Sequence, residues 1–161
     1  MSTLPHVDGA QIQGWVFCGT LGWLSDLARS DRHIVVPSLA EFTEQWHFSH
    51  AVRATGLLLL SGVTGTDVRG VVDPDPARQF EQAFVHLADC LEAAGAGMAD
   101  LVELTSYHVD LRHHLATFIA VKDRQVRAPY PAWSAIGISE LITPGALVEI
   151  RAVATDPNAT P

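Results

Sequence analysis

Glu149 is the residue of this chain best suited to acid–base chemistry. It lies in the segment "ALVEIRAVA", residues 146–154, where only Glu149 and Arg151 are charged. Apolar surroundings remove water from a carboxyl group, and this desolvation raises its pKa toward the range that general acid–base catalysis uses. Glutamates are seldom buried without a partner, so an ion pair with Arg151 or with an arginine of a neighbouring copy is the structural alternative.

Trp133 is the second candidate, in the segment "PYPAWSAIGI", residues 129–138. The prolines predict an extended chain, and the small and β-branched residues after them predict a strand. On a strand, Trp133, Ala135 and Gly137 share one face, opposite Ile136 and Ile138. The indole could pack in the core or in an interface. It could also wall a ligand pocket, with the small residues beyond it leaving room.

Histidines offer a third kind of chemistry. His108, in the predicted strand "SYHVD", could titrate near neutral pH, or it could be a structural histidine with its hydrogen bonds satisfied. The nearest approaches to a metal-binding pattern are His47 with His50 and His113 with His114. Strand residues three apart point to opposite faces and adjacent helical residues diverge, so no metal site is expected.

Clear signals mark both ends of one predicted helix. Asp75 supplies an N-cap, Pro76 stands in the first turn, and Gly95 or Gly97 ends the helix. Its apolar side chains recur at helical spacing and form one stripe, which consists of Phe80, Phe84, Leu87, Leu91 and Ala94.

Short strands are predicted around this helix. An edge strand is expected at 33–36, stopped by Pro37, and a hairpin is expected to turn at Thr55 and Gly56. The second arm of the hairpin, 57–61, carries apolar residues on both faces, so both faces should be covered. The remaining predicted elements are a strand at 101–110, a helix at 111–126, and strands at 133–138 and 146–154.

This order predicts an α+β sandwich in which two helices cover one face of a mixed sheet. Val148, Ile150 and Ala152 alternate with Glu149 and Arg151, and one helix layer can meet only one of these two sets. If the apolar set meets the helices, Glu149 lies on a face that nothing in this chain covers. The pattern therefore predicts a homo-oligomer with Glu149 near the subunit interface.

Composition limits the classes of function. The chain has 161 residues, 48% of them hydrophobic, which predicts one compact domain. We expect an N-terminal extension at 1–32, the domain at 33–156 and a short C-terminal tail at 157–161. A net charge of −8 with ten Lys and Arg residues argues against nucleic acid as a partner, because phosphate binding needs clustered cations.

Membrane and secretory signals are not predicted. The apolar segment 12–24 is too short to span a bilayer and lacks the basic flank of a signal peptide. Cys18 and Cys90 form no CxxC pair, and Cys90 falls within the helical pattern as a small buried residue. A cytoplasmic location is therefore expected, without a membrane partner.

The predicted elements and their motifs resemble the RidA (YjgF) family of small trimeric proteins, also called endoribonuclease L-PSP-like. The resemblance runs unbroken over 34–154 and is carried by "HFSHAVRATGLLLLSG", "LEAAGAGMADLVELTSYHVD" and "YPAWSAIGI…PGALVEIRAVA". It implies a chorismate-mutase-like fold of the ferredoxin-like βαβ kind, assembled as a homotrimer with clefts between subunits. It further implies hydrolysis of reactive enamines and imines to ketoacids and ammonia, with neither a metal nor an organic cofactor.

One position departs from that family in a chemically important way. The family's "PAR" arginine, which holds a substrate carboxylate, is matched here by Trp133 in "PAW". An indole cannot replace charge-assisted hydrogen bonds, so this position predicts a neutral, aromatic or cationic ligand. The pattern "YPxWxAxG" with the "SYHVD" strand resembles a YjgH-like subgroup.

The resemblance also implies roles for other residues. Glu149 matches the acid that positions water or moves a proton, and Ser61 of "LSG" matches a cleft residue. Phe48 stands where a tyrosine is common, and Ala135 stands where some members carry a cysteine. The leading hypothesis is a small-molecule hydrolase in which Glu149 activates water, Ser61 orients the substrate, and Trp133 and Phe48 wall the pocket.

A second hypothesis involves no catalysis. The missing arginine and the unusual N-terminal segment are also compatible with a trimer that binds a ligand or another protein. A ribonuclease, the third class considered, is disfavoured by the acidic balance of the chain.

Overall fold

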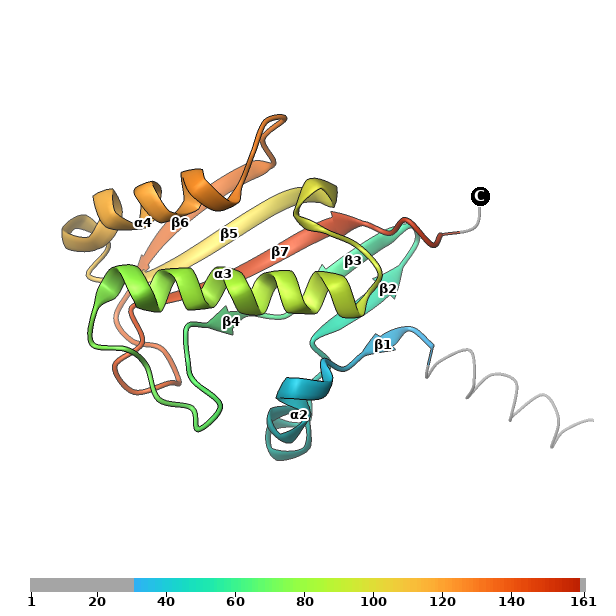
Figure 1. The fold of residues 1–161 in the computed structure, drawn as a ribbon, viewed down its shortest axis with the longest axis horizontal. Coiled ribbons are helices and arrows are strands. Elements are labelled where there is room, and N and C mark those ends of the chain that lie inside the picture. The colour runs from blue at the N-terminus through green and yellow to red at the C-terminus, as the bar shows by residue number, and fades with distance from the viewer. Residues whose placement is uncertain (1–30, 160–161) are drawn as a thin grey trace, which may run out of the picture. The chain divides into compact units, whose positions relative to one another are not determined.

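Residues 31–159 are described by the computed structural model shown in Figure 1. The predicted extension lies outside the described residues except for Asp31 and Arg32. Residues 160 and 161 of the predicted tail lie outside them as well.

A mixed sheet forms the centre of the fold (Figure 1). Its strands lie in the order β1-β2-β3-β7-β5-β6, and β4 pairs with β7. Every pairing is antiparallel except that of β5 with β6, which is parallel. The strands are β1 (His33–Ile34), β2 (Ala51–Ala54), β3 (Leu57–Leu60), β4 (Val63–Thr64), β5 (Leu101–Val109), β6 (Ala132–Ile138) and β7 (Val148–Thr155).

Helices of different length connect these strands. They are the short 3-10 segments η1 (Pro37–Leu39) and η2 (Met98–Asp100) and the α-helices α2 (Ala40–Trp46), α3 (Pro76–Ala93) and α4 (Leu111–Gln125). The Asp75 carboxylate accepts the backbone N–H of Ala77 and caps α3, as the sequence predicted. Among the described residues, no helix has the length and apolar character needed to cross a membrane.

Both long helices pack on the same side of the sheet (Figure 1). The strand β7 shows the consequence, because Val148, Ile150 and Ala152 are buried, whereas Glu149 is half-buried and Arg151 is exposed. We call the side carrying Val148 the helix face and the side carrying Glu149 the open face. The predicted α+β class, with two helices on one face of a mixed sheet, is confirmed.

The core between this sheet and the helices contains the predicted stripe of α3, since Phe80, Phe84, Leu87, Leu91 and Ala94 are all buried. Cys90 is buried there too, as predicted, and burial raises the pKa of its thiol to about 12. Cys18 lies outside the described residues.

The unit β5–α4–β6 determines which side chains of the edge strand β6 contact a helix. Parallel neighbouring strands need a crossover connection, and α4 supplies it on the helix face. Side chains of β6 that point to the helix face therefore meet α4.

Apart from the two 3-10 segments, two elements were missed in the sequence. The segment 40–46 forms α2, which contains no buried residue and so shows no apolar stripe. The first arm of the predicted hairpin begins at Ala51, after α2, and Phe48 lies in the connection before it. The other missed element, β4, has only two residues, too few for alternation to show.

His108 is a buried polar exception within the core. It lies on β5, is 0% exposed, and packs edge-on against Phe118 with ring centroids 4.6 Å apart. Neither ring nitrogen has a hydrogen-bond partner among the described residues. Burial, with a smaller contribution from His114, lowers the pKa of His108 to about 4.

Replacing His108 by leucine is expected to stabilise the folded chain and to flatten its pH dependence. Below the ordinary pKa of 6.5 the unfolded chain binds a proton that the folded chain accepts only near about 4, so the free energy of unfolding falls as the pH falls through this range. At about 1.4 kcal/mol per pH unit, the loss approaches about 3 kcal/mol. Removing two unpaired buried nitrogens should add about 1–3 kcal/mol at neutral pH.

Urea unfolding at neutral pH and at about pH 4.5 measures both effects. His113→Leu, which also replaces a histidine but at an exposed position of α4, is the matched control and should keep the stability loss that His108 causes. A His108→Leu variant that loses stability on acidification as steeply as the wild type would contradict this account.

Candidate functional site

Glu149 projects from β7 onto the open face, where its carboxylate lies over the backbone of Gly62. A β-carbon added at Gly62 would overlap Oε1 of Glu149 and come within 2.6 Å of its carboxyl carbon. The absence of a side chain at Gly62 therefore creates the space that the carboxylate occupies.

The surroundings of Glu149 favour its protonated form. Burial raises the pKa of this carboxyl above its ordinary 4.5. None of the ion pairs among residues 31–159 includes Glu149 or Arg151, so the pairing considered as a structural alternative is not formed within one protomer. A carboxyl group with a raised pKa and no counter-charge binds its proton more tightly than a solvated one, which suits a group that exchanges protons with a substrate.

Ser61 and the segment containing Phe48 are linked to the Gly62 segment over which this carboxylate lies. Ser61 directly precedes Gly62, and its Oγ donates a hydrogen bond of 2.7 Å to the carbonyl of Ser49. The backbone N–H of Ser61 donates to the carbonyl of His50 at 2.9 Å. Phe48 stacks at a tilt against His50, with ring centroids 5.1 Å apart. Three predicted site residues, Glu149, Ser61 and Phe48, are thus contributed by adjoining segments.

Trp133 lies on the other side of the sheet. Its Nε1–H donates to the Ser106 hydroxyl at 3.0 Å, and its ring lies 6.1 Å from that of Phe118 on α4. The Lys122 ammonium, also on α4, stands 4.7 Å from the centroid of the indole. Trp133, Ala135 and Gly137 do share a face, as predicted, but this face is turned toward α4 and away from Glu149.

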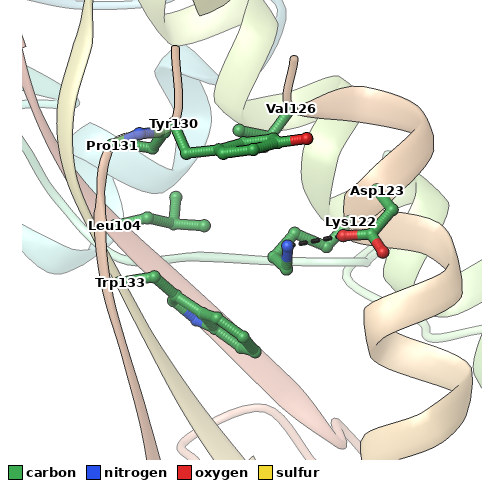
Figure 2. A pocket seen from close by; sticks show the side chains of 7 residues that line it. All are labelled: Leu104, Lys122, Asp123, Val126, Tyr130, Pro131 and Trp133. Carbon is green, nitrogen blue, oxygen red and sulfur yellow. Dashed lines mark hydrogen bonds and ion pairs between the residues drawn. The ribbon is translucent and has the colours of Figure 1, made fainter. Parts of the chain in front are cut away.

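A pocket of about 440 Å³ opens beside this indole (Figure 2). Figure 2 shows Tyr130 and Trp133 on two sides of the pocket, with Lys122 and Asp123 reaching toward it from α4. We call it the Trp133 pocket; its lining residues are Leu104, Lys122, Asp123, Val126, Tyr130, Pro131 and Trp133.

Lys122 and Tyr130 were not recognised as functional candidates in the sequence. The available signal was the helical spacing of Phe118 and Lys122, four residues apart and therefore on one face of α4. Using it requires knowing that this face of α4 lies over β6, which only the fold reveals.

The remaining predicted site residues are separated from Glu149. Ala135 is exposed on the helix face of the edge strand β6, in register with Ser106. His108 is enclosed in the core, so it does not reach a ligand at the surface of one protomer. Within one protomer the six residues therefore do not form a single site. Across residues 31–159, no three His, Cys, Asp or Glu side chains gather as metal ligands.

Known proteins similar to this chain share most of its length. The profile of the family described as Endoribonuclease L-PSP matches residues 39–156. The RutC family protein YjgH of Escherichia coli is 35% identical over 112 residues, which are 69% of this chain and 84% of that protein. A 2-iminobutanoate/2-iminopropanoate deaminase of Dermatophagoides farinae is 32% identical over 108 residues, 66% of this chain and 83% of that protein.

A solved structure of a protein YjgH has the same fold. It superimposes with a TM-score of 0.73 at 30% sequence identity, covering 79% of this chain and 97% of that structure.

Replacing Gly62 by alanine is expected to displace the Glu149 carboxylate with little effect on folding. The new methyl group would occupy the carboxylate's position, and the end of a long side chain can move aside at small cost. The pKa of Glu149 should then fall back toward 4.5, because the carboxylate moves into water.

NMR titration of the Glu149 carboxyl carbon measures this change. Gly97→Ala is the matched control, because a β-carbon there meets nothing within 4 Å. An unchanged Glu149 pKa in Gly62→Ala would show that Gly62 does not define the carboxylate's position.

Proposed function

Because the chain belongs to the endoribonuclease L-PSP family, the RidA (YjgF) family that its motifs resemble, we propose that it is a small-molecule hydrolase of the imine-deaminase kind. Its substrate is a small enamine, imine or related electrophilic metabolite. The reaction needs neither a metal nor an organic cofactor. The deaminase of Dermatophagoides farinae, a relative that bears this activity in its name, supports the reaction class.

The observation that carries the proposal is the environment of Glu149. A general base must be desolvated enough to hold its proton near working pH, yet it must reach substrate. Glu149 is half-buried, has a raised pKa, and lies on the open face rather than in the core.

The proposed step balances with water as the only co-reactant. Glu149 takes a proton from water as the water oxygen bonds to the carbon of the C=N group, and the electron pair of the double bond moves to nitrogen. Nitrogen takes up that proton from Glu149, which gives a carbinolamine. Glu149 then carries the hydroxyl proton to the same nitrogen, the C–N bond breaks, and ammonia leaves as the carbonyl forms. An enamine first takes up a proton on carbon and loses one from nitrogen, which gives the imine. Ser61 and the strand backbone beside Gly62 orient the substrate, and Phe48 supplies a wall of the site.

Assembly as a homotrimer would complete this site in clefts between subunits. Apolar side chains on the open face support assembly, because Leu59 and Ile136 are 38% and 42% exposed in one protomer. The register places Ile136, Tyr107 and Glu149 in one row across the sheet. A neighbouring copy covering this row would desolvate Glu149 further, and its own edge strand β6 would bring Trp133 and Ala135 to the cleft.

A trimer that binds a ligand without turning it over is the second candidate function. It is favoured by the replacement of the family's arginine by Trp133, which removes the usual contact to an imino acid. Saturable ligand binding without ammonia release would support this candidate over the hydrolase.

Replacing Glu149 by glutamine is expected to abolish hydrolysis. Loss of a general base lowers the rate by about 100- to 10,000-fold. The assay follows ammonia release from imines generated in situ from a panel of amino acids, with the oligomeric mass measured in parallel. Full activity in Glu149→Gln would exclude Glu149 as the base.

The pH dependence should identify the same group. A base must be deprotonated, so wild-type activity should fall as the pH drops through the Glu149 pKa, which lies above 4.5. Because this pKa is raised, the folded chain binds the proton more tightly than the unfolded chain does, and the charged form costs stability at higher pH. Glu149→Gln should therefore unfold at a higher temperature than the wild type at neutral pH.

Replacing Ile136 by glutamate is expected to weaken assembly, because a charge would be buried beside a neighbouring copy. Sedimentation or light scattering should show three copies for the wild type and a shift toward single chains for Ile136→Glu. Val85→Glu is the matched control, since Val85 is 48% exposed on α3, on the far side from the open face. Equal masses for all three proteins would place the interface elsewhere.

A further inference from the structure

We propose that the Trp133 pocket binds a small carboxylate, with the charge held by Lys122 and the apolar body of the ligand packed on Trp133. This binding step needs only one protomer. Its use as the handle for a reacting substrate rests on the proposed hydrolase function.

Lys122 places a cation beside Trp133, the position at which the sequence had indicated the loss of the family's arginine. Its Nζ stands 4.7 Å from the centroid of the Trp133 ring, a distance at which the aromatic face attracts the ammonium. The side chain of Lys122 is only 13% exposed, so its ammonium is held in one orientation and is partly desolvated.

The ammonium has donors left for a ligand. A lysine carries three N–H groups, and the structure gives Lys122 a single hydrogen-bond acceptor among the described residues, Oδ1 of Asp123 at 2.6 Å. Figure 2 shows this ion pair at the edge of the pocket, with the indole on another side of the ammonium. An incoming carboxylate can therefore accept a charge-assisted hydrogen bond from Lys122.

The rest of the pocket suits an apolar body of modest size. Leu104, Val126 and Pro131 line it together with the rings of Tyr130 and Trp133. The indole N–H is already donated to Ser106, so Trp133 presents its ring to a ligand and not a donor. A volume of about 440 Å³ accommodates one aromatic ring or a branched aliphatic chain with its carboxylate.

Asp123 is the competing anion at this site. It is 61% exposed, so its carboxylate can turn into water at little cost when a ligand carboxylate arrives. The next cation on the same helix turn, Arg124, is paired with Glu81 of α3 and is directed away from this competition. Asp123 thus holds the ammonium in place while the pocket is empty and weakens, without preventing, the binding of an anion.

The pocket changes what the missing arginine implies. Trp133 in the arginine position does remove a bidentate carboxylate clamp, but α4 brings a different cation over the indole that replaced it. A ligand recognised here is anionic with an apolar body, whereas Trp133 alone favoured a neutral, aromatic or cationic one.

The experiment titrates the full-length protein with three probes of matched shape and different charge: phenylacetate, phenylacetamide and phenethylamine. Calorimetry measures binding, and the NMR signal of the Trp133 indole N–H, assigned with Trp133→Phe, reports its location. Phenylacetate should bind saturably and most tightly of the three while shifting that signal. Absence of saturable phenylacetate binding, or tighter binding of the amine, would overturn the proposal.

Variants of the two charged residues test the assignment. Lys122→Met should weaken phenylacetate by about tenfold or more and leave phenylacetamide unchanged, as expected for a lost charge-assisted hydrogen bond. Lys122→Arg, which keeps the charge, is the folding and charge control and should retain binding. Asp123→Asn should tighten phenylacetate by about two- to fivefold by removing the competing anion. Equal phenylacetate affinity in Lys122→Met and wild type would exclude Lys122 as the anion site.

Glu149→Gln separates this inference from the hydrolase proposal, because it lies on the other face of the sheet. If Glu149→Gln and the wild type bind phenylacetate equally and the wild type hydrolyses no imine of the panel, the pocket is supported and the hydrolase is contradicted. The rates of hydrolysis of anionic and neutral imines should also be compared in Lys122→Met and the wild type. If Lys122→Met prefers anionic over neutral imines as strongly as the wild type does, the pocket does not bind the carboxylate of the reacting substrate.

Discussion

One layer of helices packed against a sheet with two faces is the constraint on which the rest of this structure depends. The helices α3 and α4 cover only the helix face, and the alternation of β7 follows from that, with Val148, Ile150 and Ala152 inward. Burial of these side chains provides the main driving force for folding. The same alternation obliges Glu149 to lie on the open face, where no core residue competes for its position.

Burial shifts the pKa values of two ionisable groups, one on each face of the sheet, in opposite directions. Glu149, half-buried on the open face, has a raised pKa, and His108, enclosed on the helix face, has a lowered one. Both shifts favour the neutral form, because burial penalises charge of either sign. Only Glu149 keeps access to the surface, so its shift serves a proposed reaction, while that of His108 costs stability in acid.

The edge strand β6 contributes both to packing against α4 and to the proposed ligand pocket. Because α4 connects β5 to β6 across the helix face, Trp133 packs near Phe118 and beneath Lys122, and a pocket forms at their border. The two candidate sites of one protomer therefore lie on opposite faces. A neighbouring copy that brings its β6 edge to the Glu149 side would join them, which is why assembly matters to the proposed chemistry.

Local patterns in the sequence were sufficient for the fold class, the capped helix α3, the hairpin and the inward face of β7, because caps, turns and alternation are set by residues near in sequence. They also raised Glu149 and Trp133 as candidates, but the roles predicted for both residues came from the family resemblance. They could not assign Trp133, Ala135 and Gly137 to the α4 side of the sheet, since alternation says which side chains share a face but not which face it is. The space over Gly62, the isolation of His108 and the cation that Lys122 brings to Trp133 were decided only by the tertiary structure, because each depends on contacts between segments far apart in the chain.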